Sequence, residues 1–123
     1  MARITARDIG LSALCAWQSG TPSRGQLAVA ARYTLELLEQ KAPGHSVEVR
    51  VPPFAAVQVI EGPRHTRGTP PNVIETNADT WLALATGTLN WDDAVAATLV
   101  SASGDRCNHI ATFLPLVTPD TQA

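Results

Sequence analysis

The residues that could carry out chemistry are few and scattered along this chain of 123 residues. His45, His65 and His109 lie far apart, and they form no His-x-x-x-His pair or carboxylate cluster with the spacing of metal ligands. Cys15 and Cys107 form no Cys-x-x-Cys pair for zinc or redox chemistry. The sequence therefore predicts no metal site and no cofactor.

Patterns for nucleophilic catalysis are equally weak. Ser101 and Ser103 lie in no nucleophile-elbow motif, and the glycines form no dinucleotide or phosphate-loop fingerprint. Cys107 and His109 could form a thiolate–imidazole pair, although a buried, unreactive thiol explains Cys107 as well. The adjacent acids at 92–93 fit the positive end of a helix better than a catalytic pair. We expect a protein that is not an enzyme.

The best polar candidate is a basic stretch in a turn-rich loop at 62–71. Arg64, His65 and Arg67 could hold a phosphate, a carboxylate or a lipid headgroup, because a guanidinium offers two parallel donors. The alternative is a solvated hairpin loop whose arginines pair with Glu61 or Glu75.

Composition limits the remaining classes. A chain of this length forms one domain, and 45% hydrophobic with 16% charged residues is typical of a globular protein. A net charge of −2 argues against a nucleic-acid binder. The two arginines near the N-terminus precede no apolar run of a signal peptide, and no stretch approaches the ~20 apolar residues of a membrane span. We expect a cytoplasmic protein without integral membrane association.

Periodicity predicts helices first, strands in the middle and helices again at the end. A Thr5–Asp8 capping box should begin a helix that runs to Trp17, and Thr21–Pro22 should begin a longer one that ends at Pro43–Gly44. Alternating apolar residues then predict strands. After the third strand, helical periodicity and capping residues predict further helices. The expected strands are 47–51, 55–60, 72–76 and about 100–103, and the later helices are 78–86, a second from 91 to about 99, and 105–114. This order predicts an α+β domain.

Several segments resemble the sterol carrier protein 2 family. Members typically place an apolar helix ending in glycine after a strand, as in Trp81-Leu-Ala-Leu-Ala-Thr-Gly87, and later a strand ending in a Gly-Asp pair, here Gly104-Asp105. The segment VEVRVPPFAAVQVIEGPRHTRGTPPNVIET is similar to short bacterial sterol-carrier-like proteins of actinobacteria. Together these segments cover about 46–116.

The resemblance implies an SCP2-like fold with about five strands in a mostly antiparallel sheet, covered by helices on one face. It also implies an apolar tunnel between sheet and helices in members that carry lipid. The same fold occurs as an accessory domain of mycothiol-dependent isomerases and some acetyltransferases. We expect an N-terminal helix at 1–20 packed on a domain at 21–116, with a disordered tail at 117–123.

Such a tunnel would be lined by apolar residues of the sheet and the late helices. The candidates are Val57, Val59, Val73, Trp81, Leu84, Trp91, Val95, Ile110, Phe113 and Leu114. The alternative is that these side chains fill the core, as apolar stripes normally do. The expected function is non-catalytic binding or carriage of a lipid, an acyl chain or another small apolar molecule. Two alternatives are a closed-core module for protein interaction and an accessory subunit of a mycothiol-type, thiol-dependent enzyme. An edge strand could also pair with a second copy.

Overall fold

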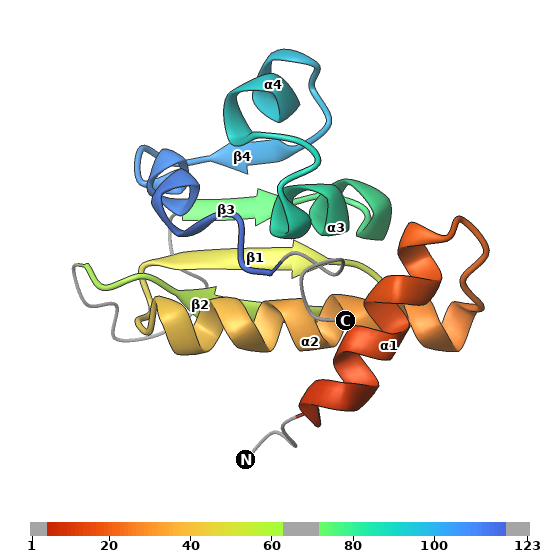
Figure 1. Ribbon diagram of the computed structural model, residues 1–123. Helices are drawn as coiled ribbons and strands as arrows, with labels where there is room; N and C mark the ends of the chain where they lie inside the picture. The colour runs from red at the N-terminus through yellow and green to blue at the C-terminus, as the bar shows by residue number, and fades with distance from the viewer. Residues whose placement is uncertain (1–4, 63–71, 118–123) are drawn as a thin grey trace.

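The computed structural model describes residues 5–62 and 72–117, in which a layer of helices packs on a β-sheet (Figure 1). The elements are α1 (Arg7–Gln18), α2 (Arg24–Lys41), β1 (Val47–Val51), β2 (Ala55–Val59), β3 (Asn72–Glu75), α3 (Ala78–Thr86), α4 (Trp91–Ala96), β4 (Ser101–Ser103) and the 3-10 helix η1 (Cys107–Phe113). The predicted α+β class and order of elements are confirmed. None of the helices in these two ranges has the length and apolar character needed to span a membrane.

Both N-terminal helices exist, but their predicted starts are wrong. Thr5 does not cap α1, because its backbone N–H and its hydroxyl both donate to the Glu36 carboxylate, which joins α1 to α2. The second helix begins only at Arg24. Ser23 accepts a hydrogen bond from the backbone N–H of Gln26, and the Gln26 side chain accepts one from the backbone of Ser23, so this pair is the capping box.

Among the residues that the structure describes, the sheet has four strands in the order β2-β1-β3-β4. β1 is antiparallel to β2, and β3 is antiparallel to β4, but β1 and β3 are parallel. The expected count of about five strands is therefore wrong for the described residues, and the sheet is mixed, with two antiparallel pairs and one parallel pair. The central parallel pair arises because β3 follows β2 in sequence but lies on the other side of β1.

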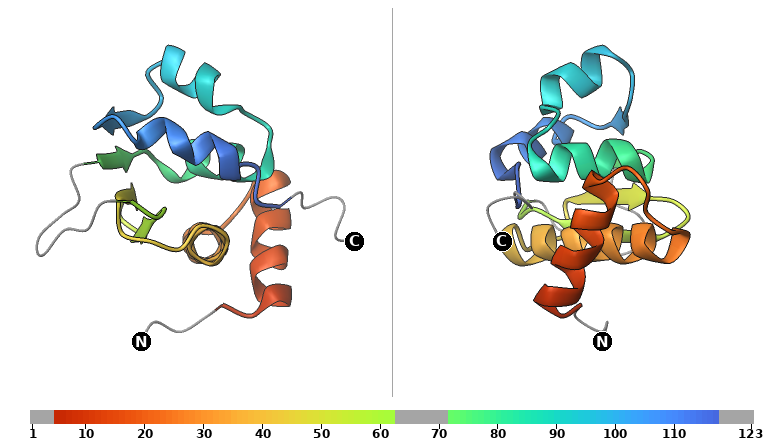
Figure 2. Two further views of the ribbon diagram at one scale, coloured as in Figure 1. Left: turned by 90° about the vertical axis from the view of Figure 1, so that its left-hand side faces the viewer. Right: turned by 45° about the vertical axis from the view of Figure 1, so that its right-hand side comes forward.

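The two faces of the sheet differ in polarity. Val47, Val49 and Val51 are fully buried on the face that carries the helices (Figure 2). The register places Ile74 beside Val49, so it also points to this face. Polar side chains of Glu48, Arg50, Gln58 and Glu75 occupy the opposite face. The one-sided covering predicted for the sheet is what the views show.

The core lies between the sheet and the helices, and Trp81 of α3 is the largest fully buried side chain. Its indole Nε1–H donates to Thr34 Oγ1 of α2 at 2.8 Å, and the Thr34 hydroxyl donates to the Ala30 carbonyl at 2.8 Å. This hydrogen bond joins α3 to α2 through buried polar atoms that have partners.

The late elements are shorter than the periodicity predicts. The helix beginning at Trp91 ends at Ala96 instead of continuing to about 99, and Thr98 follows with a positive φ of 54°. The final helix is a 3-10 helix from Cys107 to Phe113. Of the tail predicted to be disordered, only Val117 is among the described residues, and its N–H donates to the Ala85 carbonyl at 3.2 Å.

Candidate functional site

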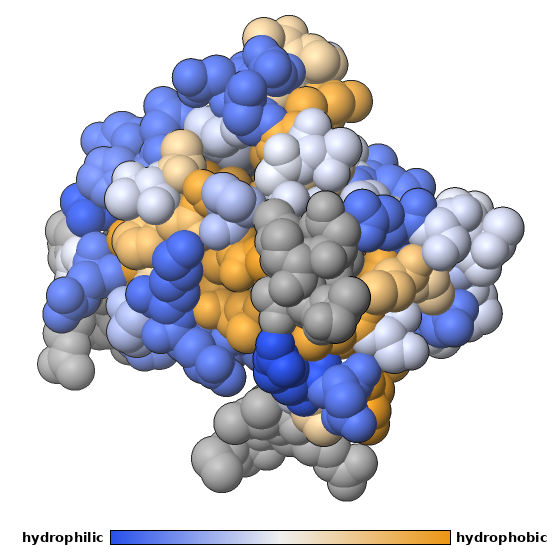
Figure 3. Space-filling view, viewed as in Figure 1, coloured by the Kyte–Doolittle hydropathy of each residue, from blue (hydrophilic) through white to orange (hydrophobic). Residues whose placement is uncertain are grey.

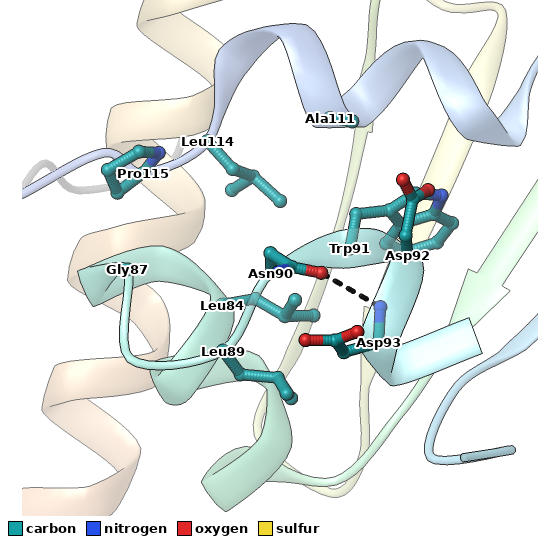
Figure 4. Close-up of a pocket in the computed structure, with 10 residues that line it drawn as sticks. All are labelled: Leu84, Gly87, Leu89, Asn90, Trp91, Asp92, Asp93, Ala111, Leu114 and Pro115. Carbon is teal, nitrogen blue, oxygen red and sulfur yellow. Dashed lines mark hydrogen bonds between the residues drawn. The ribbon is translucent and has the colours of Figure 1, made fainter. Parts of the chain in front are cut away.

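A cavity of about 400 Å³ lies where α3 ends, α4 begins and η1 finishes (Figure 4). On this side of the molecule, apolar side chains form a central area with hydrophilic side chains around it (Figure 3). Ten described residues line the cavity: Leu84, Gly87, Leu89, Asn90, Trp91, Asp92, Asp93, Ala111, Leu114 and Pro115. Its volume is within the range of about 300–1,000 Å³ found for small-molecule sites.

The wall between α3 and α4 is built by two helix caps. Gly87 ends α3 in the left-handed region at φ +84°, a conformation that costs residues with a Cβ more than glycine. The chain then returns toward α3, since the Leu89 N–H donates to the Ala83 carbonyl at 3.1 Å. Asn90 caps α4 by accepting a hydrogen bond from the Asp93 N–H at 2.8 Å. These turns place Leu89 beside Leu84 (Figure 4).

The facing wall is the end of η1 and the segment after it. The Leu116 N–H donates to the Ala85 carbonyl at 2.7 Å, which fixes this segment against α3. The Lys41 ammonium at the end of α2 donates to the carbonyls of Phe113 and Pro115 at 3.1 and 3.4 Å. Leu114 and Pro115 are thereby held at the cavity.

The cavity has an apolar floor and an acidic end. Leu84 is 1% exposed and Trp91 is 4% exposed, so both side chains belong to the core as well as to the lining. The Trp91 Nε1–H donates to Asn108 Oδ1 at 2.8 Å, which leaves its ring as an apolar surface. Asp92 and Asp93 are exposed, and their carboxylates lie at the end near Trp91 (Figure 4).

The structure separates the ten predicted apolar candidates into groups. Leu84, Trp91 and Leu114 come together in the cavity. Fully buried core positions are taken by Val59, Trp81 and Ile110, and half-buried positions against the core by Val57 and Phe113.

The remaining two apolar candidates lie away from this group. Val73 pairs with Glu48 of β1, so its side chain is on the open face of the sheet and cannot share a lining with Val57 and Val59. Val95 is 42% exposed on α4. A single tunnel that joins all ten residues is therefore inconsistent with the register of the sheet.

None of the predicted polar candidates is among the described residues that line this cavity. Arg64, His65 and Arg67 lie outside the described residues. Cys107 is buried, and its thiol donates to the carbonyls of Val73 and Ser103. Burial raises the pKa of this thiol, which opposes the thiolate needed for a nucleophile. Among residues 5–62 and 72–117, no three His, Cys, Asp or Glu side chains are grouped to hold a metal.

Several lining residues escaped the sequence analysis. Leu89 directly precedes the helix cap Asn90, the position of a hydrophobic staple, and this signal could have identified it. In the sequence, Asp92 and Asp93 indicate the start of a helix and not a cavity wall. Ala111 and Pro115 carry no signal in the sequence, because they line the cavity only through the path of the chain after η1.

Two other hollows are more open to solvent. One, of about 650 Å³, lies between α1 and the start of α2 and is lined partly by Ile9 and Val29. The other, of about 540 Å³, lies beside Trp17, whose Nε1–H donates to Asp79. Neither hollow is lined by buried apolar side chains of α3 and α4, as the first cavity is by Leu84 and Trp91. The cavity at Leu84 and Trp91 is therefore the best candidate site.

Comparison with known proteins places the cavity in a family context. The sequence model of the family described as "Bacterial SCP ortholog" matches residues 23–116. The match covers every element that lines the cavity and begins at the residue that caps α2. No curated protein matches the chain.

Proposed function

The chain belongs to the bacterial SCP ortholog family, as its resemblance to sterol carrier proteins predicted, and we propose that it binds a small apolar molecule in the cavity between α3, α4 and η1. In this role the protein is a non-catalytic carrier or binding domain. The ligand class is a single acyl or alkyl chain or a molecule of similar size.

The observation that carries the proposal is the cavity itself. Six of its ten lining residues have largely apolar side chains: Leu84, Leu89, Trp91, Ala111, Leu114 and Pro115. They come from separate segments that hydrogen bonds hold together, so the hollow is built into the fold and does not depend on one loop. Apolar lining with a few polar groups is typical of small-molecule sites.

The expected affinity is modest. Burying about eight methylenes would contribute up to about 6 kcal/mol at ~0.8 kcal/mol each, from which association costs must be subtracted. A free energy of this size corresponds to a dissociation constant of tens of micromolar or weaker, on the order of what a partly open cavity should give. Exchange of such a ligand would be rapid, as carriage requires.

The first test is native mass spectrometry of the purified protein, followed by organic extraction, with displacement of a fluorescent fatty-chain probe as the second readout. We expect saturable displacement of the probe at tens of micromolar or weaker, and a co-purified apolar molecule would be further support. A clean unliganded mass together with no saturable binding of any apolar probe would contradict the proposal and favour a closed-core interaction module.

A pair of neighbouring substitutions localises the binding. Ala111 and Thr112 are both exposed on η1, but only Ala111 lines the cavity. Ala111→Phe should fill the cavity and weaken probe binding at least about tenfold, the equivalent of losing about two buried methylenes. Thr112→Phe, the matched control, should leave binding unchanged. Equal binding by both variants would place the ligand elsewhere.

A further inference from the structure

The strand β4 forms one edge of the sheet in the part of the chain that the structure describes (Figure 1). All three of its residues, Ser101, Ala102 and Ser103, are exposed. The strand at the other edge, β2, lies beside α2, which runs along it (Figure 1). The Ile60 N–H, just after β2, donates to the Ala42 carbonyl, just after α2, at 2.7 Å. Of the two edges, β4 is therefore the one more open to another chain.

The hydrogen bonds of β3 show which backbone groups of β4 are directed outward. The Thr76 N–H, just after β3, donates to the Arg50 carbonyl of β1 at 3.1 Å. Because the backbone groups of successive residues in a strand point to opposite sides, those of Glu75 point toward β4, where Glu75 pairs with Ser101. The next residue, Ala102, therefore directs its N–H and C=O away from β3. Neither group has a hydrogen-bond partner among the described residues, so together they can pair with another strand.

The sequence around β4 lacks the side chains that usually prevent strand pairing. Natural proteins commonly place charged residues or proline on a free edge strand. Residues 94–104 contain neither a charged residue nor a proline. Two of the three large apolar side chains that are exposed among the described residues, Val95 and Leu99, lie in the same stretch. An exposed, uncharged and partly apolar stretch of this kind favours contact with another chain.

We propose that β4 pairs with β4 of a second copy of this chain, antiparallel and about a two-fold axis at Ala102. The strand reads Ser-Ala-Ser in both directions, so this pairing places serine opposite serine and alanine opposite alanine. The N–H of each Ala102 donates to the Ala102 carbonyl of the other copy, which gives two equivalent hydrogen bonds. In this register Asp105, the charged residue nearest to β4 in sequence, lies opposite Leu99 and not opposite a second carboxylate. This self-complementarity selects a second copy as the occupant of the edge.

The dimer should be weak and should not grow further. Stable complexes bury about 800 Å² on each partner, and a strand of three residues contributes only part of that area. A dissociation constant on the order of 0.1–1 mM is therefore expected. Because a two-fold pairing uses the β4 edge of both copies and β2 lies beside α2, association should stop at the dimer.

The test is sedimentation equilibrium of the full chain from about 10 μM to about 2 mM, a range that brackets the expected dissociation constant. Ala102→Lys places a charge on the pairing edge and should weaken dimerisation at least about tenfold. Ala102→Pro removes the outward N–H, which β3 does not use, and should have the same effect with the fold intact. Ala56→Lys changes an exposed alanine on the other edge strand and is the matched control, which should dimerise like the wild type.

Disulfide trapping tests the register directly. Opposed residues of a hydrogen-bonded antiparallel pair have Cα atoms about 5.5 Å apart, a separation that a disulfide can bridge. In a Cys15→Ala background, which removes the exposed native thiol, Ala102→Cys should form a covalent dimer at least about tenfold faster than Ala56→Cys in a glutathione buffer. Equal rates for the two variants would overturn the proposed register.

The remaining outcomes decide the proposal without reference to ligand binding, because β4 contributes no residue to the cavity. A monomer throughout the concentration range overturns self-pairing and leaves the edge to a strand of another protein. Unchanged dimerisation of both Ala102 variants, or assembly beyond the dimer, overturns it as well. Circular dichroism of each variant verifies folding, and Ala102→Lys decides alone if Ala102→Pro does not fold.

Discussion

Replacing Thr34 by valine should destabilise the protein because it isolates a buried donor. Thr34 is fully buried, and its hydroxyl accepts the Trp81 Nε1–H at 2.8 Å. Valine has nearly the same shape but no acceptor, so the indole N–H loses its partner away from water. A buried donor without a partner costs about 1–3 kcal/mol. With the urea dependence of about 1–3 kcal/mol per molar typical of small domains, the midpoint should fall by about 1 M.

A double-mutant cycle isolates the hydrogen bond. Trp81→Phe removes the donor, so Thr34→Val in that background leaves no donor unpaired and should cost less than in the wild type by at least about 1 kcal/mol. Urea denaturation followed by circular dichroism measures all four proteins. An equal cost in both backgrounds, or a cost of Thr34→Val below about 0.5 kcal/mol, would refute the reasoning. Binding of decanol to Thr34→Val should be unchanged, because neither residue of the pair lines the cavity.

Further predictions concern the caps and the buried thiol. Gly87→Ala should lower the free energy of unfolding by about 1 kcal/mol in urea, because φ is +84° and the new Cβ would lie 3.3 Å from Pro115 Cβ; a neutral result would contradict the strained turn. Asn77→Ala should cost about 1 kcal/mol in the same assay, since its side chain accepts the Thr80 N–H at 2.8 Å. Burial raises the pKa of Cys107, so unfolding should become easier as pH rises from about 8.5, where the unfolded thiol ionises, toward the folded value. Cys107→Ala should flatten this pH dependence and Cys15→Ala should not; identical slopes in the two variants would argue against it.

The sequence predicted an element best where residues within or next to that element determine its bounds. The helix from Ala78 to Thr86 matches its predicted bounds, because Asn77 caps one end and Gly87 takes the left-handed conformation at the other. The strand at 47–51 matches because Val47 and Val49 alternate with polar residues. Each of these signals is contained within a few residues.

The sheet pairing could not be read in this way. Alternation is the same for parallel and antiparallel strands, so nothing in Val47–Val51 indicates that β1 pairs in parallel with β3. In β3, Val73 and Ile74 are adjacent apolar residues, and only the register with β1 decides that Ile74 is buried against the helices. Asn72 can be buried because its amide nitrogen donates to the Ser46 carbonyl and its amide oxygen accepts the Arg106 N–H. Both partners are distant in sequence, so the local pattern does not indicate them.

The site was only partly predictable, because its lining residues also depend on contacts between segments that are distant in sequence. Apolar periodicity selected Leu84, Trp91 and Leu114, which the fold brings together, but it also selected Trp81 and Val73, which have other roles. Whether an apolar side chain lines a cavity or fills a core depends on its neighbours in three dimensions. Periodicity indicates only the face of a helix or strand on which the side chain lies.

The most direct test of the account is a set of intermolecular NOEs between decanol and the methyl groups of the protein. Binding in the proposed cavity predicts contacts from the alkyl chain to methyl groups of Leu84, Leu89 and Leu114, with none to Ile9 or Val29 in the hollow between α1 and α2. Contacts to Ile9 and Val29 instead, or no contacts at a saturating decanol concentration, would contradict the central claim that this cavity is the binding site.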